Sequence, residues 1–208
     1  MSGEFEGPMP MNARETYELL TFAATGAVNA TQDLVRRVRQ SVEGADAELV
    51  AEETLAFVAI ATARATEVGL REASAPKREA VTEALLELPF TYRDYLAGRA
   101  MIEAGDASMA KGAGAAREGL ERKRQFYTSH LPEGRFPGER ALTDKMALWM
   151  GRISPPKLPE MPQERLEKLD LVAHLVAHLK VVLAAARRHA SQETADDGRP
   201  TTEEGRSS

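Results

Sequence analysis

Residues 54–63, with the sequence TLAFVAIATA, form an uncharged stretch in which eight of the ten residues are hydrophobic. At about 100° per residue, Leu55, Phe57 and Ile60 project in different directions, so a helix here has no stripe left for solvent. Glu53 and Arg64 bracket the stretch, which is shorter than the roughly 20 apolar residues of a membrane span. The pattern therefore predicts the central helix of a bundle that does not span a membrane.

A periodic pattern precedes this stretch and predicts a long first helix. Asn12 is its expected N-cap, and apolar positions then recur every three or four residues, which indicates packing against another helix. Gly44 predicts the end of this helix and Asp46 the N-cap of the central one, residues 47–72. The short connection predicts that the two helices form an antiparallel pair. The predicted seam of the first helix consists of Tyr17, Leu20, Ala24, Ala27, Thr31, Leu34 and Val38.

A third helical pattern covers residues 75–102 and contains Pro89. Proline removes a backbone donor and clashes with the preceding turn, so we expect a kink or a split at this point. Gly105 and Asp106 then predict a stop and a new start, before a helix over residues 107–128. The apolar stripe of the third pattern comprises Val81, Leu85, Leu88, Tyr92, Leu96 and Ile102.

The C-terminal part predicts a short helix with Trp149 in the core, and a long apolar helix over residues 163–189. Residues 1–11 and 191–208 are acidic and rich in small and polar residues, which is typical of disorder. The sequence thus predicts an all-α antiparallel bundle of five or six helices. This bundle is expected to be a single domain, residues 12–190, between disordered N- and C-terminal tails.

Composition and charge narrow the classes of site and partner. The chain has 208 residues, a net charge of −5 and no Cys. Disulfides, thiolate metal sites and Cys nucleophiles are therefore excluded, although the redox compartment stays open. The two predicted tails carry the whole net charge, and a neutral body argues against nucleic acid as a partner. The first ten residues lack the basic and apolar regions of a secretory signal, so we expect a cytoplasmic location.

The best chemical motif lies on the last predicted helix, where Asp170, His174 and His178 follow one another at intervals of four. Two His at positions i and i+4 share a helix face and can bind one divalent transition metal. No Glu completes an HExxH pattern, so another helix would have to supply a further ligand. The alternative interpretation is a polar strip at a packing edge, with no cofactor.

The segment GRAMIEAGDASMA, residues 98–110, resembles one helical hairpin of the tetratricopeptide repeat in its Gly, Gly-Asp and Ala spacing. Asp94, Met101 and Gly114 stand where that repeat has bulky aromatic residues, and no second copy follows at a period of 34. One unit cannot build a solenoid. We therefore interpret the segment as an ordinary turn between two helices.

Two functional hypotheses follow from these patterns, and they leave open whether the chain is an enzyme. The first is a non-catalytic bundle that acts through protein–protein interaction or self-association, because its apolar helix faces exceed what one small bundle needs to bury. The second is a metal-dependent bundle enzyme that uses His174 and His178. The first predicts a homo-oligomer or a protein partner, and the second predicts a bound metal.

Overall fold

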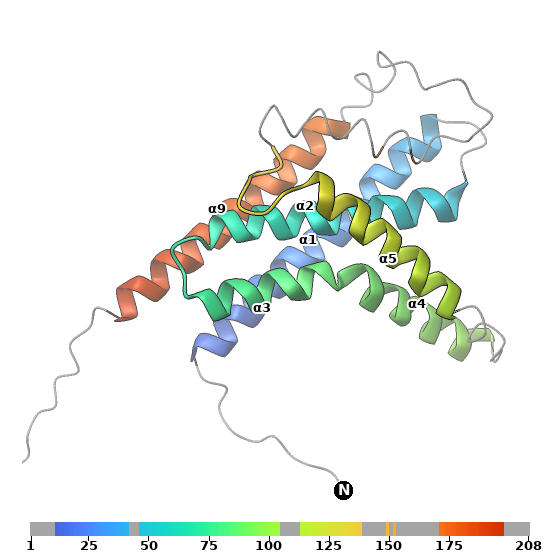
Figure 1. Cartoon of the computed structure of the whole chain (residues 1–208). Helices are drawn as coiled ribbons and strands as arrows, with labels where there is room; N and C mark the ends of the chain where they lie inside the picture. The colour runs from blue at the N-terminus through green and yellow to red at the C-terminus, as the bar shows by residue number, and fades with distance from the viewer. Residues whose placement is uncertain are drawn as a thin grey trace, which may run out of the picture.

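The computed structural model describes residues 11–41, 46–104, 113–138, 149, 152 and 171–197. Within these ranges it contains six helices and no strand, which confirms the all-α prediction (Figure 1). The helices are α1 (Met11–Ser41), α2 (Ala47–Gly69), α3 (Ala75–Leu86), α4 (Leu88–Ala104), α5 (Ala113–His130) and α9 (Leu171–Asp197).

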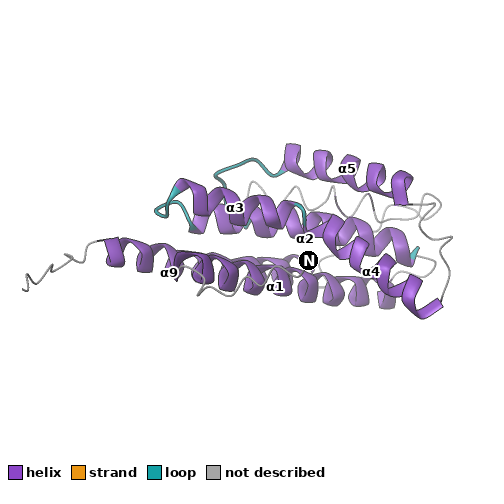
Figure 2. Cartoon of the chain, turned by 90° about the horizontal axis from the view of Figure 1, so that it is seen from below, coloured by secondary structure: helices purple, strands orange, loops and turns teal. Residues whose placement is uncertain are grey.

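The central helix of the bundle is α2, as its apolar stretch predicts. All of residues 53–66 are buried, and α1, α3, α5 and α9 each pack against it. Figure 2 shows α1 and α9 side by side in one layer, with α2 and α3 on top of them and α5 on the outside. The predicted cap is confirmed, since Asp46 Oδ1 accepts hydrogen bonds from the backbone N–H groups of Glu48 and Leu49 at 2.9 and 3.0 Å.

The bundle mixes antiparallel and parallel neighbours. The chain reverses between α1 and α2, so these helices form the predicted antiparallel pair (Figure 1). In contrast, Thr62 contacts His178 and the later Gly69 faces the later Ala186, which shows that α2 and α9 run in the same direction. α1 therefore lies antiparallel to both helices.

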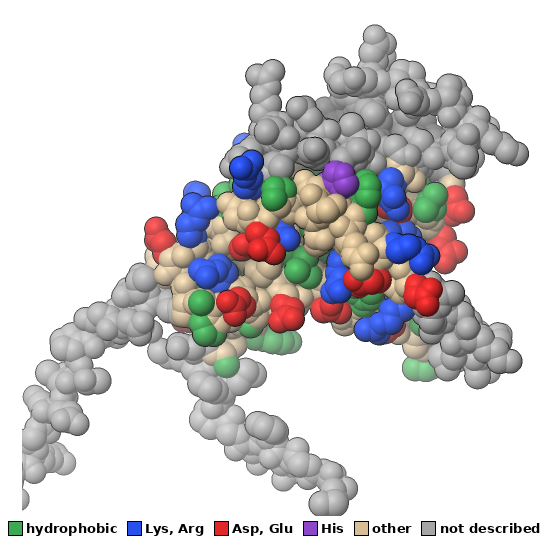
Figure 3. Space-filling model, viewed as in Figure 1, with side chains coloured by type: hydrophobic (Ala, Val, Ile, Leu, Met, Phe, Trp, Pro, Cys, Tyr) green, Lys and Arg blue, Asp and Glu red, His purple; other side chains and the backbone are tan. Residues whose placement is uncertain are grey.

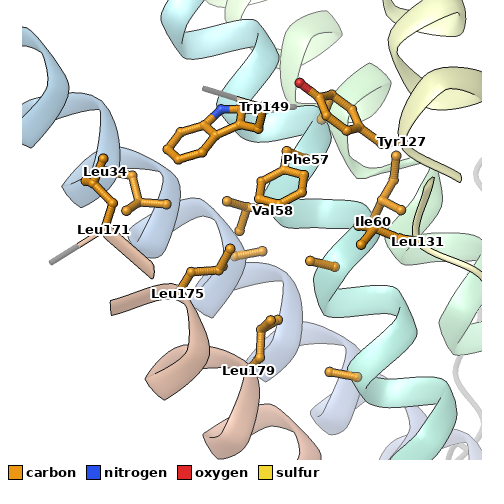
Figure 4. Packing of buried hydrophobic residues seen from close by; sticks show 14 of the residues in the cluster. Leu34, Phe57, Val58, Ile60, Tyr127, Leu131, Trp149, Leu171, Leu175 and Leu179 are labelled. Atoms are coloured by element: carbon orange, nitrogen blue, oxygen red, sulfur yellow. The ribbon is translucent and has the colours of Figure 1, made fainter. Parts of the chain in front are cut away.

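The core is organised around Phe57, whose side chain is 2% exposed. Its ring stacks on Trp149 at a centroid distance of 5.5 Å and lies 5.2 Å from the ring of Tyr127. Leu175 and Leu179 of α9 close the other side of this cluster (Figure 4). The predicted place of Trp149 in the core is confirmed.

The buried stripe of α1 differs from the predicted seam in its first half. Tyr17 is 61% exposed, and Leu19 and Ala23 take the buried positions instead. The buried residues of α1 are mostly four apart, whereas the predicted seam alternates intervals of three and four, a period of 3.5. A straight α-helix has 3.6 residues per turn, so a seam of period 3.5 would require supercoiling. The buried residues of α1 are Leu19, Ala23, Ala27, Thr31, Leu34 and Val38.

The predicted break at Pro89 is confirmed, and it changes which face of the chain is buried. α3 ends at Leu86 and α4 begins at Leu88. Before the break the predicted apolar stripe is buried, with Val81 fully so; after it Ile102 is 86% exposed. The stripe is thus part of the core in α3 and lies on the surface in α4.

The last helix extends further than the sequence predicts. α9 ends at Asp197, so residues 191–197 of the predicted disordered tail are helical, while residues 163–170 lie outside the described ranges. Leu175 and Leu179 are buried, whereas Ala173 is exposed. Among the described residues, no helix is long and apolar enough to cross a membrane.

The close approach of α2 and α9 depends on Gly69. A Cβ added at this position would lie 2.5 Å from the Cβ of Ala186 and 2.9 Å from the backbone oxygen of Leu183. One of these neighbours belongs to the backbone, so the contact can relax only if the two helices move apart. In α5, by contrast, a Cβ added at Gly119 would meet no atom within 4 Å.

Gly69→Ala is therefore expected to destabilise the protein by about 1 to 3 kcal/mol through overpacking. Gly119→Ala, the matched control, is expected to stabilise it by up to about 1 kcal/mol, because Ala has the higher helix propensity. Equilibrium denaturation in urea measures both changes. Equal effects of the two substitutions would contradict the close packing of α2 against α9.

Candidate functional site

The two histidines of the predicted metal site contact different helices. His174 Nε2 lies 2.6 Å from Arg37 Nη2, and because an Arg side chain can only donate, the imidazole nitrogen is the acceptor. His178 Nε2 lies 3.0 Å from Thr62 Oγ1, and Asp170 falls outside the described residues. Within the described ranges, no group of three His, Asp or Glu side chains is placed to hold a metal.

Metal binding by His174 and His178 stays a prediction, with a specific requirement. A cation at both Nε2 atoms would need Arg37 to move, since the guanidinium is positive and occupies the nitrogen lone pair of His174. Zinc titration of the wild type and of a His174→Ala/His178→Ala variant decides the question. If added zinc raises the melting temperature of the wild type alone, the result supports the site. If added zinc changes the melting temperature of both proteins equally, or of neither, the result contradicts it.

His178 is held neutral by its position between α1 and α2. Burial lowers its pKa to about 4, from an ordinary value of 6.5. A Cβ at Gly26 of α1 would lie only 2.9 Å from the imidazole, so this glycine leaves the space that the ring occupies. His178 therefore acts as an uncharged packing residue that bonds to Thr62.

Acid is expected to destabilise the fold through His178. Between pH 6.5 and about 4 the unfolded chain binds the proton that the folded chain excludes, so the free energy of unfolding falls as the pH falls. From pH 7 to pH 4.5 we expect the wild type to lose about 2 to 3 kcal/mol more than His178→Gln. Urea denaturation at the two pH values measures this difference. The same loss in both proteins would contradict a neutral, half-buried His178.

A partly buried ionic cluster joins α2 and α5 to Arg152. The carboxylate of Glu53 accepts two hydrogen bonds from the Arg152 guanidinium, both of 2.8 Å, and one of 2.7 Å from the Tyr127 hydroxyl. The guanidinium also lies over the ring of Phe126. Burial, and secondly the charge of Glu53, raises the pKa of Tyr127, so its hydroxyl keeps its proton. The Glu53 carboxylate, the base of this cluster, is already paired with Arg152, and the Tyr127 hydroxyl, its acid, keeps its proton. The cluster therefore has the character of a structural anchor.

The basic run on α5, residues 121–124, is largely neutralised by acidic residues. Lys123 Nζ lies 2.6 Å from a carboxylate oxygen of Glu52, and Arg124 pairs with Glu87 and Glu121. On the face shown in Figure 3, acidic and basic side chains of the described residues alternate. The run therefore offers little uncompensated charge to a phosphate backbone.

One open pocket, of about 410 Å³, lies between the first turns of α1 and the last turns of α9. Its charges nearly cancel, and Glu15 is also paired with Lys77 at 3.7 Å. Burial, followed by the charge of Lys77, lowers the pKa of His189 in its wall. The pocket therefore favours neither an anionic nor a cationic ligand. It is lined by Glu15, Glu18, Ala185, Arg188, His189 and Gln192.

The most distinctive surface is the outward side of α4. Tyr95, Leu96 and Ile102 are 61%, 44% and 86% exposed, although large apolar side chains are usually buried. At 100° per residue they fall on one side of the helix together with the half-buried Tyr92. We call this surface the α4 outer face. It comprises Tyr92, Tyr95, Leu96, Arg99, Ile102 and Glu103.

The opposite side of α4 is packed against the bundle and fixes the orientation of the outer face. Phe90 is buried, with the guanidinium groups of Arg117 and Arg124 over its ring at 5.5 and 5.4 Å. Arg93 pairs with Glu52 of α2 at 3.3 Å. These contacts hold α4 so that its aromatic and aliphatic stripe points away from the core.

The periodicity of residues 75–102 contains the signal for this surface, but the sequence interpretation assigns the stripe to the core. An apolar stripe with helical period indicates only that this side of the helix favours contact with another apolar surface. The period does not show whether the stripe packs against another part of the same chain or against another molecule. The break at Pro89 separates the two cases, with Val81 inside and Ile102 outside.

Comparison with protein-family models, with curated proteins and with solved structures finds no match to this chain. The site is therefore interpreted from its own geometry.

Proposed function

We propose that this chain is a non-catalytic interaction protein that binds an α-helix of a protein partner on the α4 outer face. The observation that supports this proposal is the exposure of Tyr95, Leu96 and Ile102 along one side of a helix whose other side is anchored. Aromatic residues and Arg are enriched where proteins bind one another, and this face contains both. A cytoplasmic location remains a prediction.

The spacing within the outer face specifies the shape of the partner. Tyr92, Tyr95, Arg99 and Ile102 follow the a and d positions of a heptad, at alternating intervals of three and four. Such a seam accepts the side chains of a second helix that lies nearly parallel or antiparallel to it. A partner helix with an apolar seam of its own is therefore the ligand that this surface fits.

The photoreactive amino acid p-benzoylphenylalanine tests this proposal when it replaces Tyr95 in the full chain in living cells. We expect one crosslinked product of defined mass, because the outer face holds its partner in a fixed position. Tyr17 is the matched control, since it is also 61% exposed but lies on α1. No product from position 95, or the same products from both positions, would contradict the proposal.

A further inference from the structure

We infer that the helix bound on the α4 outer face is α4 of a second copy of this chain, in antiparallel orientation. This inference rests on the proposed function and names its partner. In an antiparallel pair of helices, a positions face d positions. Tyr92 then meets Ile102 of the second copy, and Tyr95 meets Arg99 of the second copy. Both pairings occur twice, as a two-fold axis requires.

Electrostatics favour this orientation over the parallel one. A parallel pair would place the two Arg99 side chains against each other, and like charges in contact are unfavourable. The antiparallel pair places each guanidinium beside the ring of Tyr95, where a cation–π contact forms. Within its own chain, Arg99 is paired with Glu103 at 2.7 Å, so the outer face is neutral and two copies do not repel each other. The helix dipoles are also opposed.

The size of the surface sets the strength of the pair. Tyr92 and Ile102 are about 15 Å apart along the helix axis, which is some three turns. An interface based on so short a seam belongs to the small class, below about 1,200 Å², whose complexes are weak. We therefore expect a dimer with a dissociation constant of roughly 1 to 100 μM, governed by the few large side chains at its centre.

Sedimentation equilibrium of the full chain at about 1 to 500 μM tests the inference. The wild type should change from 22.7 kDa to twice that mass. Tyr95→Lys and Ile102→Asp should each weaken the dimer at least tenfold, because the first places a second positive charge beside Arg99 of the other copy and the second buries a carboxylate without a partner. Tyr17→Asp should behave as the wild type, and circular dichroism should show that all three variants are folded.

The register is tested with single-Cys variants, because the chain has no Cys of its own. The pairing places the two-fold axis beside residue 97, so Leu96 lies near Leu96 of the second copy. Leu96→Cys should therefore be joined rapidly into a covalent dimer by a short bis-maleimide. Asp94→Cys, exposed on another side of α4, should react with the linker without forming dimers.

The possible results separate this inference from the proposed function. A wild type that stays monomeric at 500 μM, together with a product of another mass from the photoreactive residue at position 95, overturns self-pairing and supports a different protein partner. A dimer that resists Tyr95→Lys and Ile102→Asp overturns the assignment of the interface to α4. Absence of both dimer and crosslinked product overturns both proposals.

Discussion

Burial of α2 on all sides is the constraint on which the rest of the structure depends. A helix with no polar stripe must be covered completely, and α1, α3, α5 and α9 provide that cover. The threonines within it are compatible with burial because Thr54 and Thr66 donate their hydroxyl protons to carbonyl oxygens one turn earlier. The hydroxyl groups of these threonines are therefore satisfied by α2 itself and, at Thr62, by His178.

Charged residues mark the limits of the covered stretch and attach the outer segments to it. At one end Glu53 holds Arg152 and Tyr127. At the other end the guanidinium of Arg64, which is 4% exposed, donates to the carbonyl oxygen of Leu131 and to Glu67. A buried charge without its partner is costly, so each pair fixes the position of a particular segment against α2. The outer face of α4 lies beyond this frame, and its apolar stripe is exposed.

Local signals account for the parts of the fold that the sequence predicts correctly. The cap at Asp46, the break at Pro89 and the uncharged stretch of α2, residues 54–63, each depend on neighbouring residues, which a sequence displays directly. The pairing of Glu53 with Arg152 spans 99 residues, and no local pattern specifies it. Glu52 likewise pairs with Arg93 of α4 and Lys123 of α5, which lie far from it in the sequence. The exposure of the α4 outer face is not predictable for the same reason, because periodicity alone does not distinguish a buried apolar stripe from an exposed one.

Native-state hydrogen exchange tests most directly whether the fold depends on the burial of α2. If α2 is the centre that all other helices cover, the amides of residues 54–66 exchange only when the whole protein unfolds. Their exchange free energies should then equal the free energy of unfolding measured in urea. The amides of α4 should exchange at lower free energy in the monomer, since only one side of this helix is packed. Exchange of α2 at a lower free energy than α1 or α9 would contradict the account.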